Sequence, residues 1–223
     1  MWIVCAYYTK NTTYENYSKK FIESVKQFNL PYDVVPVDNK GNWYVNMQYK
    51  PTFLKKMLEK HHPNSVIYVD IDATFCRYPG YFDKLETAQE VNIAVHVLDH
   101  SKYRRKNHPP ELLSGTIFLK NTETTKQIVN KWIQECMKDP MLWDQRALAS
   151  VLKKYKYHLL PEEYCVIFDY MSSVENPAIK HFQASRESRR KTNIKKVDLK
   201  KKRNIILPRR KIRNGVVHVR RIK

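Results

Sequence analysis

The chain has 223 residues, of which 42% are hydrophobic, 12% aromatic and 28% charged, and its formal net charge is +19. This composition is typical of a water-soluble globular protein and predicts one well-cored domain with a small appendage, while no run approaches the roughly 18 apolar residues of a membrane span. Only four glycines occur, so neither a G-x-G-x-x-G fingerprint nor a Walker A loop is present. Glycine-loop dehydrogenases and P-loop ATPases are therefore excluded.

Strand and helix patterns alternate along residues 1–180, which predicts an α/β domain with a largely parallel sheet. Pro51 suits the first turn of the second predicted helix. In chain order, the expected elements are a strand at 3–8, a helix at 14–28, a strand at 33–37, a helix from 50 to about 58, and strands at 65–69, 92–98 and 115–119, followed by a helix at 124–136.

The start of the chain and its cysteines bear on the compartment. Residues 1–6 enter the first strand directly, without the basic stretch and long apolar core of a secretory signal peptide, which favours a cytoplasmic location. No C-x-x-C pair of the kind used by zinc sites is present, so the cysteines are expected to be free and mostly buried. They are Cys5, Cys76, Cys136 and Cys165.

The positive charge is concentrated at one end of the chain. Residues 180–223 hold 18 of the 41 Lys and Arg residues but only two of the 22 acidic residues, whereas residues 1–179 are nearly neutral. Such a block predicts a surface for phosphates, with a solvated tail as the alternative. Short apolar runs around Asn214-Gly215 predict a β-hairpin, because Asn-Gly tolerates the positive φ of a tight turn. We expect a main domain at 1–186 and a basic extension at 187–223.

Two aspartates follow the most apolar predicted strand, in the segment Val66-Ile67-Tyr68-Val69-Asp70-Ile71-Asp72. Ionised carboxylates are costly at such a place unless a cation or hydrogen-bond donors meet them. In an extended chain, alternate residues lie on one side, which would place both carboxylates together at a strand end where α/β sheets bind ligands. The pair predicts a Mn²⁺ or Mg²⁺ site for a diphosphate substrate; the alternative is that the aspartates form a turn or a cap.

Several further motifs follow in order, and the series resembles the GT-A nucleotide-diphospho-sugar glycosyltransferases over about residues 1–186. The resemblance implies a GT-A, Rossmann-like fold, with a mixed, mostly parallel sheet flanked by helices. In that fold the D-x-D pair holds the metal and the sugar nucleotide, and a late histidine completes the metal site. Asp70, Asp72 and His181 are the implied metal ligands, and an ordinary buried histidine is the alternative for His181. The motifs are Asp70-Ile71-Asp72, Leu113–Leu119, Trp143–Leu148 and Ile179–Phe182.

The same resemblance implies roles for other residues. Ser114 and Gly115 would line the sugar pocket, and Asp144 with Gln145 would face the donor or acceptor, although Asp144 also suits a helix N-cap. Lys50 matches a recurring Lys-Pro position and would meet the donor phosphates; a solvated surface lysine is the alternative. Three residues at the end of the first strand are expected to contact the nucleotide, namely Tyr7, Tyr8 and Thr9.

The sequence departs from the family after His181. Family members often continue with a Gly and a Lys-Pro-Trp segment, whereas this chain has Gln183-Ala184-Ser185-Arg186. Arg186 is predicted to replace a lysine as the clamp on the diphosphate, because a guanidinium binds phosphate well. The likeness of the His181 segment to retaining enzymes favours retention of the anomeric configuration.

The predicted reaction is transfer of a hexosyl or pentosyl group from a sugar nucleotide, UDP-linked by preference, to a hydroxyl. The basic extension favours nucleic acid as the acceptor, such as DNA with hydroxymethylated pyrimidines whose target base would be flipped into the donor pocket. The alternative is a peripheral enzyme that glycosylates a lipid-linked or surface glycan while its basic end rests on anionic lipid. A third possibility is a non-catalytic nucleic-acid-binding module on the same fold.

Overall fold

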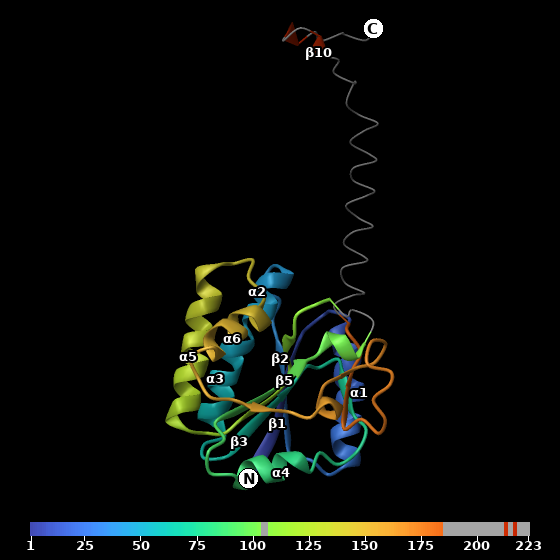
Figure 1. The fold of residues 1–223 in the computed structure, drawn as a ribbon, viewed down its shortest axis with the longest axis vertical. Coiled ribbons are helices and arrows are strands. Elements are labelled where there is room, and N and C mark those ends of the chain that lie inside the picture. Colours follow the sequence, from blue (N-terminus) through green and yellow to red (C-terminus); the bar gives the residue numbers. More distant parts are fainter. Residues whose placement is uncertain (104–106, 185–211, 214–215, 218–223) are drawn as a thin grey trace. The chain divides into compact units, whose positions relative to one another are not determined.

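A six-stranded sheet organises the larger part of the molecule (Figure 1). The computed structural model describes residues 1–103, 107–184, 212–213 and 216–217, and the chain divides into two units, Met1–Phe182 and Gln183–Lys223. The boundary expected after residue 186 and the predicted clamp Arg186 both lie outside the described residues.

The main sheet is mixed and mostly parallel, as predicted. Its strand β6 runs antiparallel to both of its neighbours, β3 and β5, whereas the other neighbouring strands pair in parallel. From one edge to the other the strands are β2 (Tyr32–Val37), β1 (Trp2–Thr9), β3 (Ser65–Val69), β6 (Glu111–Leu119), β5 (Ile93–Leu98) and β7 (His158–Leu159).

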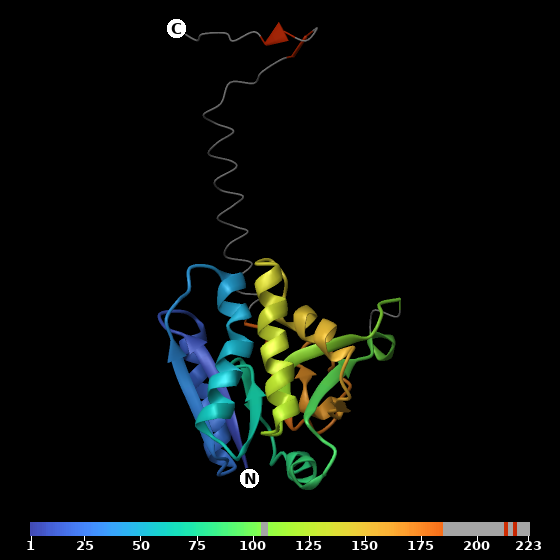
Figure 2. The same ribbon diagram turned by 90° about the vertical axis from the view of Figure 1, so that its left-hand side faces the viewer.

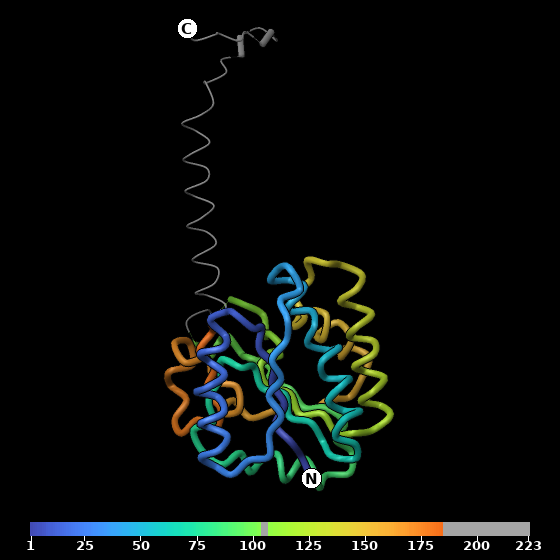
Figure 3. Tube along the Cα trace, turned by 180° about the vertical axis from the view of Figure 1, so that it is seen from behind, coloured from blue at the N-terminus to red at the C-terminus, as the bar shows by residue number. Residues whose placement is uncertain are grey.

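Helices cover both faces of this sheet, so that the unit has three layers (Figures 1 and 3). On one face, α1 (Tyr14–Gln27) and α4 (Tyr81–Thr87) contribute Phe21 and Phe82 to the core. On the other face, α3 and α5 lie side by side (Figure 2) and pack with α6 over the sheet. These helices are α3 (Lys50–Lys60), α5 (Glu123–Lys138) and α6 (Asp144–Leu152); the short α2 (Trp43–Gln48) precedes α3.

Strand β3 is the centre of the core. Its five residues are all buried, and they alternate between the two layers: Ile67 and Val69 join the cluster under α1, whereas Val66 and Tyr68 join the cluster under α3 and α5. Burial on both faces explains why the strand has no alternation of polar and apolar residues after Ser65. Each large side chain that is fully buried there stabilises the fold by roughly 1.5–3 kcal/mol.

A second, three-stranded sheet carries the late histidine to the end of β3. It consists of β4 (Ala73–Phe75), β9 (Ile179–His181) and β8 (Val166–Ile167), with β9 in the middle. Strand β9 pairs antiparallel with β4, and His181 is in register with Ala73. The chain therefore brings residue 181 beside the residue that follows Asp72, across more than a hundred positions of sequence.

Outside the larger unit, β10 (Ile212–Arg213) pairs antiparallel with β11 (Val216–Val217). This confirms the hairpin predicted around Asn214-Gly215. The four cysteines are free, and all but Cys76 are buried, as expected. No helix among the described residues is long and apolar enough to cross a membrane. Among the described residues, short turns of 3₁₀ helix also occur at His100–Lys102 and Glu162–Tyr164.

Candidate active site

The two aspartates of the D-x-D motif lie on a tight turn between β3 and β4. The sequence analysis considered an extended chain at this point, but the structure has a turn. The amide of Ala73 donates a hydrogen bond to the carbonyl of Asp70 at 3.0 Å. The amide of Asp70 in turn donates to the carbonyl of Gly115 on β6, at 2.8 Å. The aspartates are thus brought together by a turn that is fixed to the neighbouring strand, and not by strand alternation.

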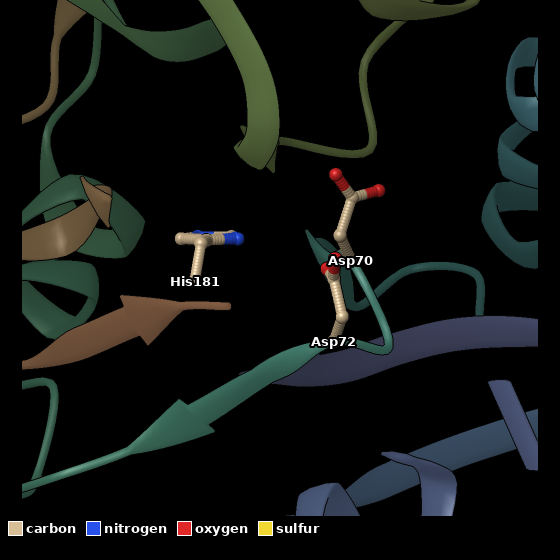
Figure 4. A group of neighbouring side chains, drawn as sticks. All are labelled: Asp70, Asp72 and His181. Atoms are coloured by element: carbon tan, nitrogen blue, oxygen red, sulfur yellow. The ribbon is translucent and has the colours of Figure 1, made fainter. Parts of the chain in front are cut away.

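His181 faces the same turn from β9. Figure 4 shows its ring and the two carboxylates projecting toward one space. The backbone holds the arrangement, because the amide of Phe182 donates to the carbonyl of Asp72 at 2.9 Å. One ligand atom from each of Asp70, Asp72 and His181 lies within 4.8 Å of the others. The three residues predicted as metal ligands are therefore neighbours in space.

Burial keeps His181 in the form that binds metals. The side chain is 3% exposed, and burial lowers its pKa to about 4, although the negative charge of Asp70 acts in the opposite direction. At neutral pH the imidazole is therefore uncharged, with a lone pair on one nitrogen. Two carboxylates and an imidazole suit Mn²⁺, or Mg²⁺ where carboxylate and phosphate oxygens predominate.

Gly115 leaves room between these groups. A Cβ atom at this residue would lie 3.2 Å from Nδ1 of His181 and 3.3 Å from Oδ2 of Asp70. The absence of a side chain thus keeps open a space that an imidazole nitrogen and a carboxylate oxygen both face. The donor set and this space together fit a bound divalent cation.

Lys50 connects the D-x-D turn to the second group of predicted residues. Its Nζ lies 3.1 Å from Oδ1 of Asp70 and 2.9 Å from Oδ2 of Asp144, and it donates to the carbonyl and the hydroxyl of Ser114. Ser114 also donates from its hydroxyl to Asp144 at 3.1 Å. Lys50 is 5% exposed, so it is a buried member of the site and not a solvated surface lysine.

The charge of Lys50 is stabilised by its partners. Burial lowers the pKa of its ammonium, but the charges of Asp144 and Asp70 outweigh this effect, and the pKa lies above the ordinary value. Asp144 is the first residue of α6, whose N-cap is Trp143. The Asp144 side chain therefore serves the Lys50 cluster, and the N-cap alternative for it is wrong.

Tyr68 belongs to the site although its sequence context gave no sign of this. It lies in the apolar run of β3 and is 2% exposed, yet its hydroxyl donates to Oδ1 of Asp70 at 2.7 Å. Burial raises the pKa of this phenol, and the nearby carboxylate of Asp70 adds to the effect, so Tyr68 remains a donor at neutral pH. Tyr68 and Lys50 together hold Oδ1 of Asp70, while Oδ2 faces His181.

Both polar atoms of the Gln145 side-chain amide form hydrogen bonds within the protein. Its Oε1 accepts from the backbone amide of Ser114 at 3.1 Å, and its Nε2 donates to Glu111 at 2.7 Å. Glu111 also lies 3.2 Å from Nε2 of His100, whose Nδ1 is 2.9 Å from the hydroxyl of Tyr170. The chain of contacts ties α6 to the start of β6, at the place where Ser114 enters the site.

The three predicted nucleotide contacts at the end of β1 pack against α2 and the core of the larger unit. The hydroxyl of Tyr7 donates to the carbonyl of Asn46 in α2 at 3.0 Å, and its ring packs against Tyr49 and Phe53. Tyr8 packs on the core under α1, and Thr9 is buried. Tyr7 thus joins β1 to α2 beside Lys50, and contacts of these three residues with a nucleotide stay a prediction.

Comparisons with known proteins bear on the family and the fold of the chain. A family model described as nucleotide-diphospho-sugar transferase matches residues 18–196. By sequence, no curated protein matches the chain.

Solved structures share the fold at low identity. A glycosyltransferase involved in glycosylating the major capsid of PBCV-1 has a TM-score of 0.62 at 11% identity, over 82% of this chain and 93% of that one. Mouse xyloside xylosyltransferase 1 has a TM-score of 0.55 at 12% identity, over 82% and 98%. GlyE of Streptococcus pneumoniae has a TM-score of 0.56 at 13% identity, over 81% of this chain but only 54% of its own.

The family model and the fold shared with solved glycosyltransferases identify a protein of the GT-A sugar-transferase class. With the family model matched over most of its length, the chain belongs to the nucleotide-diphospho-sugar transferases.

Proposed function

We propose that the chain is a metal-dependent glycosyltransferase that moves a hexosyl or pentosyl group from a UDP-sugar to a hydroxyl on DNA, with hydroxymethylated pyrimidines as the favoured acceptor. The observation that carries the donor half is the grouping of Asp70, Asp72 and His181 within 4.8 Å, around the space that Gly115 leaves open. The acceptor half rests on the basic extension.

In this proposal Asp70, Asp72 and His181 hold Mn²⁺ or Mg²⁺. A bound ion would act as a Lewis acid that neutralises the charge developing on the leaving diphosphate. Lys50 places a positive charge between Asp70 and Asp144, and we propose that it meets the donor phosphates. Arg186 is proposed as a second phosphate contact, and Tyr7, Tyr8 and Thr9 as contacts of the nucleotide.

Asp144 is the residue proposed to contact the reacting sugar or the acceptor. Its carboxylate is fixed by Lys50 and by the Ser114 hydroxyl, so its position is set before substrate binds. Ser114 and Gly115, which lie on β6, are proposed to line the sugar pocket. Because both ends of the Gln145 amide are bonded within the protein, we give Gln145 the task of holding Ser114 and Asp144 in place.

The acceptor is argued from charge, since transferases of this fold act on different acceptors: among the neighbours are a protein involved in capsid glycosylation and a xyloside xylosyltransferase. Residues 180–223 carry 18 basic residues and two acidic ones. Polyanions release condensed counterions when such a segment binds them, which favours nucleic acid. The segment has no Trp or Tyr, the aromatic anchors that are common where a basic segment lies on a membrane.

A donor test needs no knowledge of the acceptor. The full chain is incubated with Mn²⁺ and each of a panel of sugar nucleotides, and release of nucleoside diphosphate is measured with DNA, RNA or lipid extract present. Mass spectrometry of the recovered polymers identifies the product. Transfer in the presence of excess chelator would overturn the metal dependence, and a product found only in lipid would replace DNA by the membrane alternative.

Binding of the acceptor is tested by salt titration with a variant that has a less basic extension. For the native chain, the log of the DNA affinity should fall with log salt by about 0.9 per phosphate contact. Replacing four basic residues by Gln should make that slope shallower, while the same change at four exposed lysines of the larger unit should not. The first set is Lys200, Lys201, Lys202 and Arg203, and the control set is Lys19, Lys20, Lys153 and Lys154.

The same two variants separate DNA from lipid. Sedimentation with anionic vesicles is run at the same salt concentrations. If the native chain ignores DNA and RNA at low salt but binds vesicles through the basic extension, the nucleic-acid acceptor is wrong.

A further inference from the structure

Aromatic side chains gather where α2 and the start of α6 meet (Figure 1). The rings of Trp43 and Trp143 lie 5.8 Å apart, edge to face, and the ring of Tyr44 lies 5.1 Å from that of Trp43. Gln48 fastens α2 at this place, because its Nε2 donates to the carbonyl of Leu142 at 2.8 Å. Trp43, Tyr44 and Trp143 thus form a ring cluster whose members are far apart in the sequence.

The ring cluster is accessible to a ligand. Trp43, Tyr44 and Trp143 are each partly exposed, whereas the other two tryptophans of the chain, Trp2 and Trp132, are 6% and 0% exposed. Tryptophan is highly buried on average, because its large ring is costly to leave in water. Aromatic surface that stays in contact with water at one place is a common mark of a binding site.

Positive charges lie over the rings of this region. The guanidinium of Arg146, an exposed residue, is 5.7 Å from the centre of the Trp143 ring. Nζ of Lys40 and Nζ of Lys56 lie 4.3 Å and 5.9 Å from the ring centre of Tyr49, the residue that follows α2. Rings together with cations fit a ligand that is both flat and anionic. Nucleic acid is such a ligand, because its bases stack on aromatic rings and guanidinium planes while its phosphates meet the cations.

The ring cluster adjoins the residue that is proposed to contact the acceptor. Trp143 immediately precedes Asp144 in the chain, and the carboxylate of Asp144 is bound to Lys50 at 2.9 Å. Lys50 begins α3, which follows α2 almost directly. A group held on the ring cluster is therefore held next to the point at which α6 enters the site.

We propose that the ring cluster, with Arg146, is a stacking platform for a base of the acceptor nucleic acid. The inference deepens the proposed function and rests on its nucleic-acid acceptor. An enzyme that modifies a base takes it out of the stack, and aromatic side chains then replace the lost stacking. The basic extension would supply affinity for the phosphates, and the platform would supply the contact with the base.

Tryptophan fluorescence tests the platform without any transfer reaction. Residues 180–223 contain no tryptophan, so quenching by a bound oligonucleotide reports a contact with the larger unit. We expect quenching of the full chain by a single-stranded pyrimidine oligonucleotide, and little quenching by an abasic oligonucleotide with the same number of phosphates. Equal quenching by both, or by neither, would overturn the proposal. Quenching by a panel of disaccharides and by no oligonucleotide would replace the base by the ring of a glycan.

Variants at Trp43 locate the contact, with affinity measured from the anisotropy of a labelled oligonucleotide. Trp43→Ala should weaken binding by about tenfold, and Trp43→Phe, which keeps a ring, should retain most of the affinity. The salt dependence should stay native in both, because no charge is removed. The control is Tyr78→Ala, since Tyr78 is 50% exposed but packs against Trp2, the first residue of β1. Native affinity in Trp43→Ala would overturn the proposal.

Arg146→Gln tests the charged part of the platform. It should weaken binding and lower the salt slope by about 0.7, the value of one phosphate contact on a single strand. The matched control is Arg77→Gln, which removes a guanidinium that lies 5.8 Å from the ring centre of Tyr164. Base-dependent quenching in a chain that transfers no sugar to DNA would support the platform and show that the acceptor is wrong. Transfer to DNA without such quenching would overturn the platform alone.

Discussion

Asp70 and Asp144 share one lysine, yet they are held differently. The Asp144 side chain is 5% exposed and its Oδ2 is bonded to Lys50 and to Ser114. The Asp70 side chain is 35% exposed; its Oδ1 is held by Lys50 and Tyr68, and its Oδ2 faces His181. The buried carboxylate has its counter-ion within the protein, whereas the partly exposed one has an oxygen directed at a place for an external cation.

This difference separates two tasks in one small cluster. A carboxylate that is fully buried with its counter-ion is costly to disturb, because removing the partner leaves an unpaired charge in a poorly solvated place. A carboxylate at the edge of the site can exchange partners as substrate and metal arrive. The structure therefore predicts that changes at Asp144 and Lys50 act on the fold and the reaction, and that changes around Asp70 act on metal affinity.

The largest expected effect comes from replacing each of the two carboxylates by an amide, one at a time. Asp70→Asn should abolish Mn²⁺ binding and reduce transfer by about 10³-fold or more, because the leaving group loses its charge stabilisation. Asp144→Asn should reduce transfer while leaving Mn²⁺ affinity unchanged. Affinity is measured by calorimetry with Mn²⁺ and a sugar nucleotide, beside a transfer assay. Equal loss of Mn²⁺ affinity in both variants would break the distinction.

The second-largest expected effect is on the free energy of unfolding. Lys50→Met removes the cation from between two carboxylates, and because its side chain is 6% exposed, the free energy of unfolding should fall by about 3–5 kcal/mol. Urea unfolding followed by circular dichroism measures the change. The control is Lys10→Met, which removes an exposed ion pair with Asp38 and should alter stability little. A loss no larger than in this control would show that Asp144 does not depend on Lys50.

The fold and the candidate site differ in how much of each could be predicted from the sequence. Strand β3 and helix α5 were predicted correctly, because a run buried on both faces and an amphipathic repeat are local patterns. The reversed direction of β6 and the three-residue strands β4 and β9 were not predicted, since direction is not encoded in apolar spacing and such short strands carry too few residues to form a pattern.

In the site, the three candidate metal ligands were named from the sequence, whereas Tyr68 and Thr116, which contact two of them, were not. Asp70, Asp72 and His181 stand out as polar residues in apolar surroundings that match a family series. Tyr68 and Thr116, by contrast, lie within strands whose other residues are core, so only the contacts of the folded chain show that their hydroxyls meet Asp70 and His181. The role of Lys50 between two aspartates likewise depends on side chains that are 20 and 94 positions away along the chain.

A smaller effect is expected from filling the space beside Asp70. In Gly115→Ala, the new Cβ would come within 3.0–3.3 Å of His181 and Asp70, so both ligands must move by a few tenths of an ångström. Mn²⁺ affinity should fall by roughly 10–100-fold, while the unfolding midpoint stays close to native. Gly80→Ala is the control, because its Cβ would make ordinary contacts at 3.7–4.0 Å. Native affinity in Gly115→Ala would mean that the cation does not lie between these ligands.

The smallest expected effect sharpens the comparison most, because it changes one hydrogen bond on Asp70 and nothing on Asp144. Tyr68→Phe keeps the buried ring but removes the donor to Oδ1, so that Lys50 alone orients the carboxylate. Mn²⁺ affinity should fall by about tenfold. The control is Tyr164→Phe, which also removes a hydroxyl in hydrogen-bond contact, at 2.8 Å from the amide of Tyr81, but away from the site. If both variants bind Mn²⁺ as the native chain does, Oδ1 of Asp70 needs no second partner, and the lysine shared with Asp144 is sufficient to direct Oδ2 toward the metal.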